Sequence, residues 1–311
     1  MIIERIDLFK VPPRWLFVKI TTKSGYSGWG EPIVEGRTDT VAAAINEMKY
    51  LLIGRDAHQI EDILLTLYKG GFYRGGIILM SAISGIEQAL WDLKGKFFGV
   101  PVYQLLGGSV RDTMRIYSWV GGDNPEDVAV HAEQRVKDGF TAVKMNLSGQ
   151  LDVNLSPWEI KQIKNNIRAV REAIGDKNDL AIDFHGRAHY HASRRLVREL
   201  EEFNPMFYEE PVLPEYSDYY KQLSMMTGVP LAAGERWVGR KEFKDIIHER
   251  SLDIIQPDLS HVGGIWEAKK IAAWAETSDV FIALHCPLGP IAFASALQFD
   301  FCTHNVIIQE T

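Results

Sequence analysis

The sequence predicts a (β/α)₈ barrel preceded by a small α+β capping domain, and three observations lead to this prediction. After residue 112, short apolar runs alternate eight times with longer stretches of helical pattern. From Asp183 onward each run ends in a polar residue, at intervals of 23 to 27 residues, which is roughly one strand, one helix and two loops. The runs are continuously apolar, as parallel strands buried on both faces are. A doubly wound sheet is the alternative, and the count of eight favours the barrel.

Residues 1–112 form the predicted capping domain. The segments IIERIDLFKV, LFVKITTKSG and YSGWGEP alternate apolar and polar residues around turns such as Ser24-Gly25, which is typical of an antiparallel meander. Helical patterns follow over residues 40–52, 58–68 and 81–97. The segment GVPVYQLLGG has breakers at both ends and predicts the domain boundary.

Residues 113–311 form the predicted barrel domain. Its eight strands are expected at 115–122, 141–146, 180–186, 206–211, 230–235, 254–259, 281–286 and 306–311. The last of them reaches the final residue, so we expect the eighth helix and the C-terminal segment to lie outside this sequence.

Composition limits the classes of partner. The 311 residues are 46% hydrophobic and carry a net charge of −7, which argues against a nucleic acid or an anionic membrane as partner. No apolar run is long enough to span a bilayer, and the charges in MIIERIDLFK exclude a signal peptide. Two cysteines are too few for a disulfide framework. We expect a cytoplasmic homo-oligomer that binds a small molecule.

Three acids end consecutive predicted strands: Asp183, Glu209 and Glu235. Because the carboxyl ends of barrel strands meet at one rim, these side chains are expected to converge. Buried together they would repel one another strongly unless a cation were present. Oxygen ligands alone select a hard ion such as Mg²⁺ or Mn²⁺, whereas zinc favours histidine or cysteine. Any one such acid could instead cap a helix or pair with arginine, but three at matching positions favour a metal site.

The last three strands end in Asp258, His285 and Glu310. A carboxylate beside the imidazole would fix its tautomer and raise its basicity, so His285 is a candidate general base. A lone histidine at a strand end is more often structural, so this interpretation depends on the metal site beside it.

The stretch LAIDFHGRAHYH, residues 180–191, holds three histidines. Since alternate strand residues share a face, Asp183 and His185 are expected to face the barrel mouth, while Phe184 faces the helical shell. His189 and His191 are interpreted as loop or helix-start residues.

Lys144 and Asn146 share a face of the second strand by the same alternation. Three acids and one divalent cation leave one negative charge, which Lys144 would neutralise before an anionic substrate enters.

These residues resemble those of the enolase superfamily, in its mandelate-racemase-like subgroup. The resemblance runs along essentially the whole chain and rests on the motifs PPRWLFVKI, GWGEP, EGR, GFYRGG, YSWVGGD, DFHGR, EEPVLPE, LAAGER, QPDLSHVGGI and HCPLGPIA. It implies a capping domain over a modified barrel, and one Mg²⁺ per subunit bound by Asp183, Glu209 and Glu235. A histidine or lysine base working beside Mg²⁺ is an established property of this superfamily.

The resemblance also implies roles for the other strand-end residues. His285, oriented by Asp258, would remove the proton α to the substrate carboxylate. Glu310 would donate a hydrogen bond to the developing enediolate, and His185 would protonate the leaving hydroxyl. An α-proton beside a carboxylate is so weakly acidic that a histidine can take it only if the resulting charge is stabilised as it forms.

One residue separates two reactions of the subgroup. In racemases of this subgroup the second strand carries the motif K-x-K, and the second lysine is a base. The similar stretch of this sequence is KMN, with Asn146 in the place of that lysine. Asparagine cannot take a proton, so a β-elimination from a sugar acid is favoured over racemisation. The resemblance implies D-galactonate as the substrate, gluconate or mannonate is the alternative, and a non-catalytic sugar-acid-binding relative is the third hypothesis.

Substrate contacts beyond these are predicted at two capping segments. Arg14 in VPPRW would lie over the barrel mouth, and Tyr73 in FYRGG could approach the same region. The alternative for both is packing or pairing at the domain interface.

Overall fold

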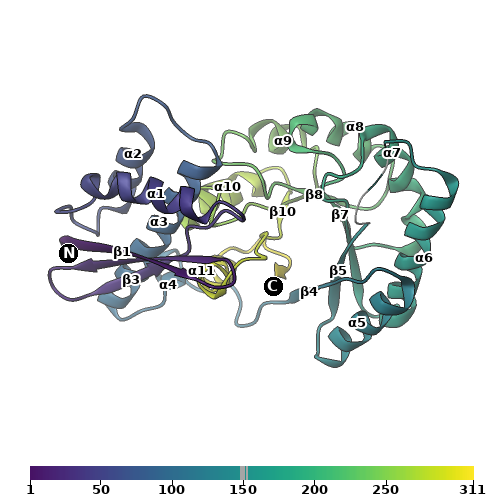
Figure 1. The fold of residues 1–311 in the computed structure, drawn as a ribbon, viewed down its shortest axis with the longest axis horizontal. Coiled ribbons are helices and arrows are strands. Elements are labelled where there is room, and N and C mark those ends of the chain that lie inside the picture. Colours follow the sequence, from purple (N-terminus) through teal and green to yellow (C-terminus); the bar gives the residue numbers. More distant parts are fainter. Residues whose placement is uncertain (148–150, 152) are drawn as a thin grey trace.

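The computed structural model describes residues 1–147, 151 and 153–311, which form an N-terminal α+β domain and a parallel β-barrel (Figure 1). The N-terminal sheet is antiparallel, with the order β1-β2-β3. Its strands are β1 (Ile3–Val11), β2 (Trp15–Thr22) and β3 (Ser27–Gly30). Alternate residues of β2 are buried, as expected of a sheet with one face on the core. The predicted meander is confirmed.

The helices of this domain gather around α3 (Ile77–Phe98), which lies on the sheet. The others are α1 (Thr38–Met48), η1 (Lys49–Leu51), α2 (Ile60–Lys69) and α4 (Val102–Leu105). The long α3 lies directly on β3 because two glycines allow it. A Cβ atom at Gly28 would stand 2.0 Å from the Ala89 carbonyl oxygen, and one at Gly30 would stand 1.9 Å from that of Gly85. The GWG motif therefore serves close packing of backbone on backbone.

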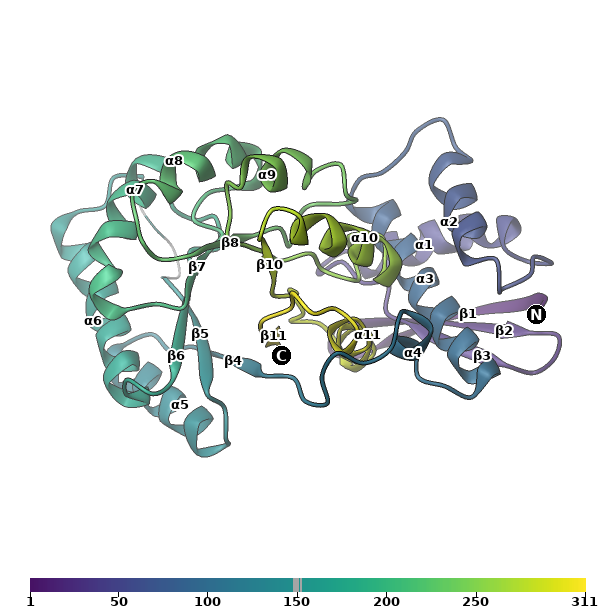
Figure 2. The same ribbon diagram turned by 180° about the vertical axis from the view of Figure 1, so that it is seen from behind.

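The second domain is a closed barrel of eight parallel strands (Figure 2), as predicted. The sheet order is β10-β9-β8-β7-β6-β5-β4-β11, and a parallel bridge between Ile282 and Val306 joins the two ends. The strands are β4 (Ile116–Val120), β5 (Ala142–Asn146), β6 (Asp179–Asp183), β7 (Phe207–Glu209), β8 (Leu231–Ala233), β9 (Ile254–Ile255), β10 (Phe281–Ile282) and β11 (Gln309–Glu310).

Helices surround the barrel on the outside (Figure 2). They are α5 (Pro125–Lys137), α6 (Pro157–Ile174), α7 (Tyr190–Glu199), η2 (Glu201–Phe203), η3 (Pro214–Tyr219), α8 (Tyr220–Ser224), α9 (Lys244–Glu249), α10 (Ile265–Glu276) and α11 (Pro290–Phe301). Local sequence sets several starts: Asn124 caps α5, and Ser156 with Glu159 forms a capping box on α6. Within the described residues, none of the helices is long and apolar enough to cross a membrane.

The barrel interior is filled by one apolar side chain from each strand or its immediate flank. These eight residues form a cluster separate from the main core: Tyr117, Ala142, Ala181, Phe207, Ala232, Ile254, Ala283 and Ile308. Alanines beside aromatic and branched side chains fill the cylinder without a channel. Two residues further along β5, β6 and β7, the inward positions are polar, so a layer of charged groups lies directly on this apolar floor.

Two sequence expectations about strand ends were wrong in detail. Strands β8, β9 and β10 end before Glu235, Asp258 and His285, so these residues lie in the loops just past the strands. Strand β6 ends at Asp183, and His185 has a left-handed φ of 56°. The backbone turns because the His185 N–H donates to Asp183 Oδ1 at 2.6 Å. The period-two argument therefore does not extend to His185, although Phe184 does pack into the outer core as predicted.

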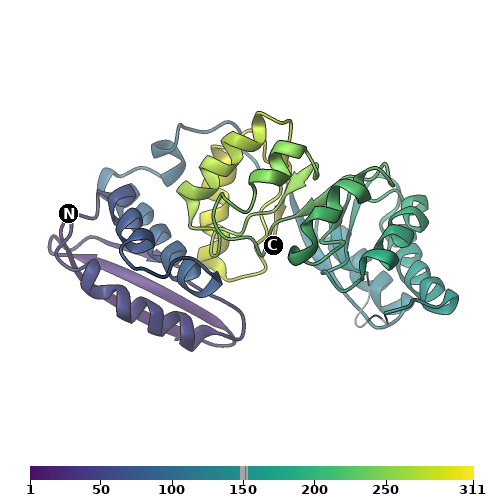
Figure 3. The same cartoon turned by 90° about the horizontal axis from the view of Figure 1, so that it is seen from above.

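The two domains are joined by buried carboxylates that cap barrel helices. Glu87 of α3 accepts hydrogen bonds from the backbone N–H groups of Ile265 and Trp266, at the start of α10. Glu31, just after β3, accepts from Gly289 and Ala292, at the start of α11. A helix start carries unpaired N–H groups and partial positive charge, which suits a carboxylate. Figure 3 shows the C-terminal part of the barrel lying against the N-terminal domain.

Candidate active site

The three predicted metal ligands lie at neighbouring strand ends and are buried. Asp183 ends β6 and Glu209 ends β7, and their Cα atoms are register partners. Glu235 follows two residues after the end of β8. Their exposed fractions are only 4%, 0% and 7%, respectively. The structure thus brings together three acids that sequence separates by 26 residues at each step.

Lys144 lies among these acids as predicted. Its ammonium donates to Glu209 Oε1 at 2.5 Å and lies 2.6 Å from Glu310 Oε1. Burial would lower the pKa of Lys144, but the charges of Glu209 and Glu310 outweigh burial and raise it well above the ordinary value. The second oxygen of Glu209 accepts from Gln256 Nε2 at 2.7 Å.

One lysine does not balance the negative charge of this cluster. Burial, with repulsion from Glu235 and Glu310, raises the pKa of Asp183 to about 7 against the opposing charge of Lys144. Burial, with repulsion from its acidic neighbours, raises the pKa of Glu209 to about 8, again against Lys144. Burial is the largest cause of both shifts, and the single charge of Lys144 does not offset it. A divalent cation would supply further positive charge.

The donor set of Asp183, Glu209 and Glu235 fits a hard cation. Among residues 1–147, 151 and 153–311, no three His, Cys, Asp or Glu side chains have the spacing of a complete metal site. Both Glu209 oxygens and one Asp183 oxygen already accept hydrogen bonds. All three side chains offer only oxygen, the ligand that Mg²⁺ prefers. A metal would therefore have to share or displace some of these bonds.

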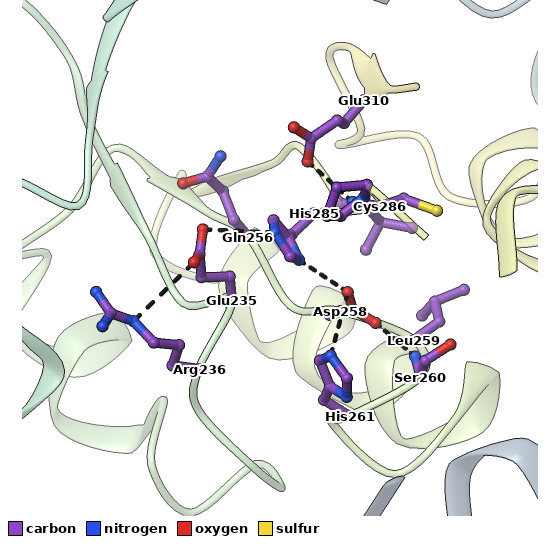
Figure 4. Close-up of polar contacts among 12 residues, drawn as sticks. Glu235, Arg236, Gln256, Asp258, Leu259, Ser260, His261, His285, Cys286 and Glu310 are labelled. Carbon is purple, nitrogen blue, oxygen red and sulfur yellow. Dashed lines mark hydrogen bonds and ion pairs between the residues drawn. The ribbon is translucent and has the colours of Figure 1, made fainter. Parts of the chain in front are cut away.

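Asp258 and His285 form a hydrogen-bonded pair beside this cluster (Figure 4). His285 Nδ1 lies 2.8 Å from Asp258 Oδ2, and the Ser260 N–H donates to Asp258 Oδ1 at 2.6 Å. The other ring nitrogen, Nε2, lies 3.7 Å from Glu235 Oε2. Burial would lower the pKa of His285, but Glu235, the Asp258 bond and Glu310 outweigh it and raise the pKa to about 10. The pair thus points its free nitrogen at the acid cluster.

Glu310 completes the ring of strand-end residues. Its Oε2 accepts from the Cys286 N–H at 2.9 Å, and its other oxygen faces Lys144. Burial would raise the pKa of Glu310, but Lys144 and His285 outweigh burial and lower it. Glu310 is therefore an ionised acceptor in this arrangement, and the donor role expected of it requires that it first receive a proton.

His185 is exposed in the mouth. Desolvation and the cations Arg187, Lys144 and Arg236 lower the pKa of His185, while Glu235 opposes them. The imidazole lies close enough to Glu235 for that carboxylate to affect its pKa. Its role as an acid stays a prediction. His189 and His191 lie at the start of α7, as expected of helix-start residues.

The remaining predicted contacts divide between the site and the surface. Arg14 donates to the Pro287 carbonyl oxygen at 2.6 Å and pairs with Glu35, so it reaches the loop that follows His285. Asn146 ends β5 beside Asp183 as its register partner. Tyr73 is 88% exposed and its ring packs against that of Phe72. The structure therefore does not bring Tyr73 into contact with the acids.

Several residues of the site were not singled out from sequence. Gln256, the partner of Glu209, lies two positions before Asp258, so period two could have found it. Trp119 precedes the end of β4, and its indole N–H donates to Asn146 Oδ1 at 3.3 Å. His261 lies 3.8 Å from Asp258 Oδ2 and is bonded to Ser81 of α3 at 2.9 Å. No local signal predicts that last contact, which joins two domains.

A capped β/α-barrel with three acids at or just past the ends of consecutive strands, facing an Asp–His pair, defines a member of the enolase superfamily, and the chain belongs to it. Residues 127–311 match the family described as enolase C-terminal domain-like. Residues 12–107 match the mandelate racemase / muconate lactonizing enzyme N-terminal domain. The resemblance seen in the sequence is confirmed.

Particular relatives narrow the comparison further. The chain is 50% identical over 310 residues to the D-galactonate dehydratases of Variovorax paradoxus (strain S110) and Pectobacterium atrosepticum, covering 100% of this chain and 81% of each relative. It also superposes on the crystal structure of an enolase from Agrobacterium radiobacter, bound to Na and L-malate, with a TM-score of 0.93, 33% identity, and coverage of 100% of this chain and 80% of that one. The prediction of a hydro-lyase is confirmed by the dehydratase relatives.

Proposed function

We propose that this protein dehydrates a sugar acid, with D-galactonate as substrate and 2-dehydro-3-deoxy-D-galactonate as product. The observation that carries the proposal is the Asp258–His285 pair directed at buried acids, in a chain half identical over its whole length to D-galactonate dehydratases. The reaction removes the proton at C2 and the hydroxyl at C3, and the resulting enol tautomerises to the 2-keto acid.

His285 is the proposed base. Asp258 holds the Nδ1 proton, which leaves the lone pair of Nε2 available to accept the C2 proton. The raised pKa of His285 would keep the ring protonated at neutral pH, and Glu235 contributes most to raising it. Neutralising Glu235 would therefore lower the pKa of His285 towards the range in which it can act as a base.

His185 is the proposed acid that protonates the departing C3 hydroxyl. It lies in the turn after β6, where its backbone N–H donates to Asp183 Oδ1 and the charge of Glu235 acts on its ring. A general acid must hold the proton that it gives up, and because the pKa of His185 is lowered, its ring must first be protonated to take this role. The proton that His185 delivers leaves in the water molecule.

Asp183, Glu209 and Glu235 would hold one Mg²⁺. When bound, the ion supplies Lewis-acid stabilisation of the charge that develops on the substrate carboxylate. Two observations support this assignment: the burial of the three carboxylates together, and the bound cation and hydroxy acid in the enolase from Agrobacterium radiobacter. Lys144 provides the remaining positive charge between Glu209 and Glu310.

Asn146 supports dehydration over racemisation. It occupies the inward position two residues after Lys144, at the end of β5. Racemisation needs a base on each face of C2. An amide cannot accept a proton, so Asn146 cannot act as the second base beside His285.

The proposal is tested by incubating the purified protein with Mg²⁺ and a panel of sugar acids, including D-galactonate, gluconate and mannonate. We expect D-galactonate to give a product that reacts with semicarbazide. Turnover of another acid in the panel with no reaction of D-galactonate would reassign the substrate. A panel without any keto product would overturn the dehydratase assignment.

The matched control is His285→Asn. This variant keeps a polar side chain with a donor towards Asp258, but it has no ring nitrogen to accept a proton. It should bind Mg²⁺ as the unmodified protein does, measured by calorimetry, and release no product. Activity in this variant would remove the base assignment.

A further inference from the structure

Trp119 faces the barrel mouth from β4. Tyr117, two residues earlier, belongs to the apolar layer inside the barrel, so period two makes Trp119 the next inward residue. Its register partner on β5 is Lys144. Trp119 is 52% exposed, whereas Tyr117 and Lys144 are 0% and 3% exposed. The indole therefore borders the open part of the mouth, directly beside the charged cluster.

Gly121 makes room for this ring. It is the next inward position of the chain, and a Cβ atom there would stand 2.0 Å from Trp119 Cη2. Gly121 is not among the glycines with a left-handed φ, so its backbone does not require glycine. The missing side chain at this position lets the indole lie over the backbone.

Trp119 also orients Asn146. The indole N–H donates to Asn146 Oδ1 at 3.3 Å, which directs the amide NH₂ group elsewhere. Within the described part of the chain, the Asn146 side chain makes no other hydrogen bond. Asn146 is the register partner of Asp183. The Asn146 amide thus keeps two N–H donors that are unused within the described residues, on the strand between Trp119 of β4 and Asp183 of β6.

We propose that Trp119 and Asn146 bind the hydroxylated chain of the substrate beyond C3 and select among sugar acids there. The proposal rests on the dehydratase function, because it assumes that the substrate carboxylate lies at the charged cluster. The indole supplies a flat apolar face for the C–H groups of the chain. The oriented amide supplies two donors for a hydroxyl oxygen. Both groups are uncharged, which matches the uncharged part of a sugar acid.

The test measures binding by calorimetry with Mg²⁺ present, in a His285→Asn background that prevents turnover. The probes are D-galactonate and glycolate, a 2-hydroxy acid with no chain beyond C2. Gly121→Ala should displace the indole and weaken D-galactonate binding about tenfold, the loss of one directed hydrogen bond with its apolar contact, and leave glycolate binding unchanged. In a Trp119→Ala background, Gly121→Ala should add nothing, because the clash is gone.

The matched control is Gly228→Ala. Gly228 lies in the loop before β8, its φ is not left-handed, and a Cβ atom there would meet nothing within 4 Å. This variant should bind both probes as the background does. Unchanged D-galactonate binding in Gly121→Ala, or equal weakening of both probes, would overturn the role of Trp119 and leave the dehydratase function standing. Absence of D-galactonate binding before any change at Gly121 would instead overturn the proposed substrate.

Discussion

Replacing Asp258 with asparagine tests how the Asp258–His285 pair works. Asp258 Oδ1 accepts from the Ser260 N–H at 2.6 Å and Oδ2 faces His285 Nδ1 at 2.8 Å. The Ser260 N–H can only donate, so it must keep the oxygen of the new amide. The amide NH₂ would then face Nδ1 of His285. The imidazole would have to accept there and carry its proton on Nε2.

That tautomer removes the lone pair that should take the C2 proton. A wrong-tautomer substitution of this kind costs about 10⁴ in kcat, which corresponds to about 5.4 kcal/mol of transition-state stabilisation. The semicarbazide assay under saturating D-galactonate and Mg²⁺ measures it directly.

Asp258→Ala is the discriminating comparison. Alanine offers no donor, so His285 remains free to hold its proton on Nδ1, although the buried Ser260 N–H loses its partner at a cost of about 1 to 3 kcal/mol in stability. We expect the alanine variant to be more active than the asparagine variant when both are assayed well below their unfolding temperatures. The reverse order, or more than a tenth of normal activity in Asp258→Asn, would refute the tautomer argument.

Three further outcomes follow from the buried charges. Lys144→Met leaves its two buried carboxylate partners uncompensated and should destabilise the metal-free protein by about 3 to 5 kcal/mol. In thermal unfolding, Mg²⁺ should restore more stability to this variant than it adds to the unmodified protein. An equal gain in both proteins would contradict the charge balance. Glu87→Gln gives the start of α10 only one acceptor atom and should lower the free energy of unfolding by about 2 to 4 kcal/mol in urea. The exposed Glu47→Gln is the control and should change the midpoint little. Equal midpoints for the two variants would show that the cap is unimportant. Because the folded-state pKa values of Asp183 and Glu209 are raised from 3.8 and 4.5 to about 7 and 8, the stability they contribute is present below about pH 4 and is lost as pH rises to about 8. The difference in melting temperature between Mg²⁺ and EDTA should therefore widen over that range, and a constant difference would argue against binding at these two acids.

The strand-end acids show how much of the site could be read from sequence. Asp183, Glu209 and Glu235 follow apolar runs at a regular interval, and in a parallel barrel that interval alone places them on one rim. The same logic indicated Glu310 at the end of β11, and Asp258 and His285 reach the same rim from the loops just past β9 and β10. Tyr73 and Arg14 lie in capping loops, where no periodicity applies, and only Arg14 reaches the neighbourhood of the site.

His185 shows where periodicity stops being reliable. The expected strand continued to residue 186, but a side-chain bond within the run bends the backbone after Asp183. A hydrogen bond of this kind competes with sheet pairing whenever an aspartate ends a strand. The residue still reaches the mouth, through a turn rather than along a strand.

The order of apolar and polar residues by itself determined the meander, the barrel and the rim on which the chemistry lies, because each depends on repeated local patterns. Only the folded chain decided which groups became partners: Gln256 with Glu209, Trp119 with Asn146, and the capping carboxylates with α10 and α11. These pairs join residues 27 to 258 positions apart. Their distances follow from the closure of the barrel and the docking of two domains, which no local pattern encodes.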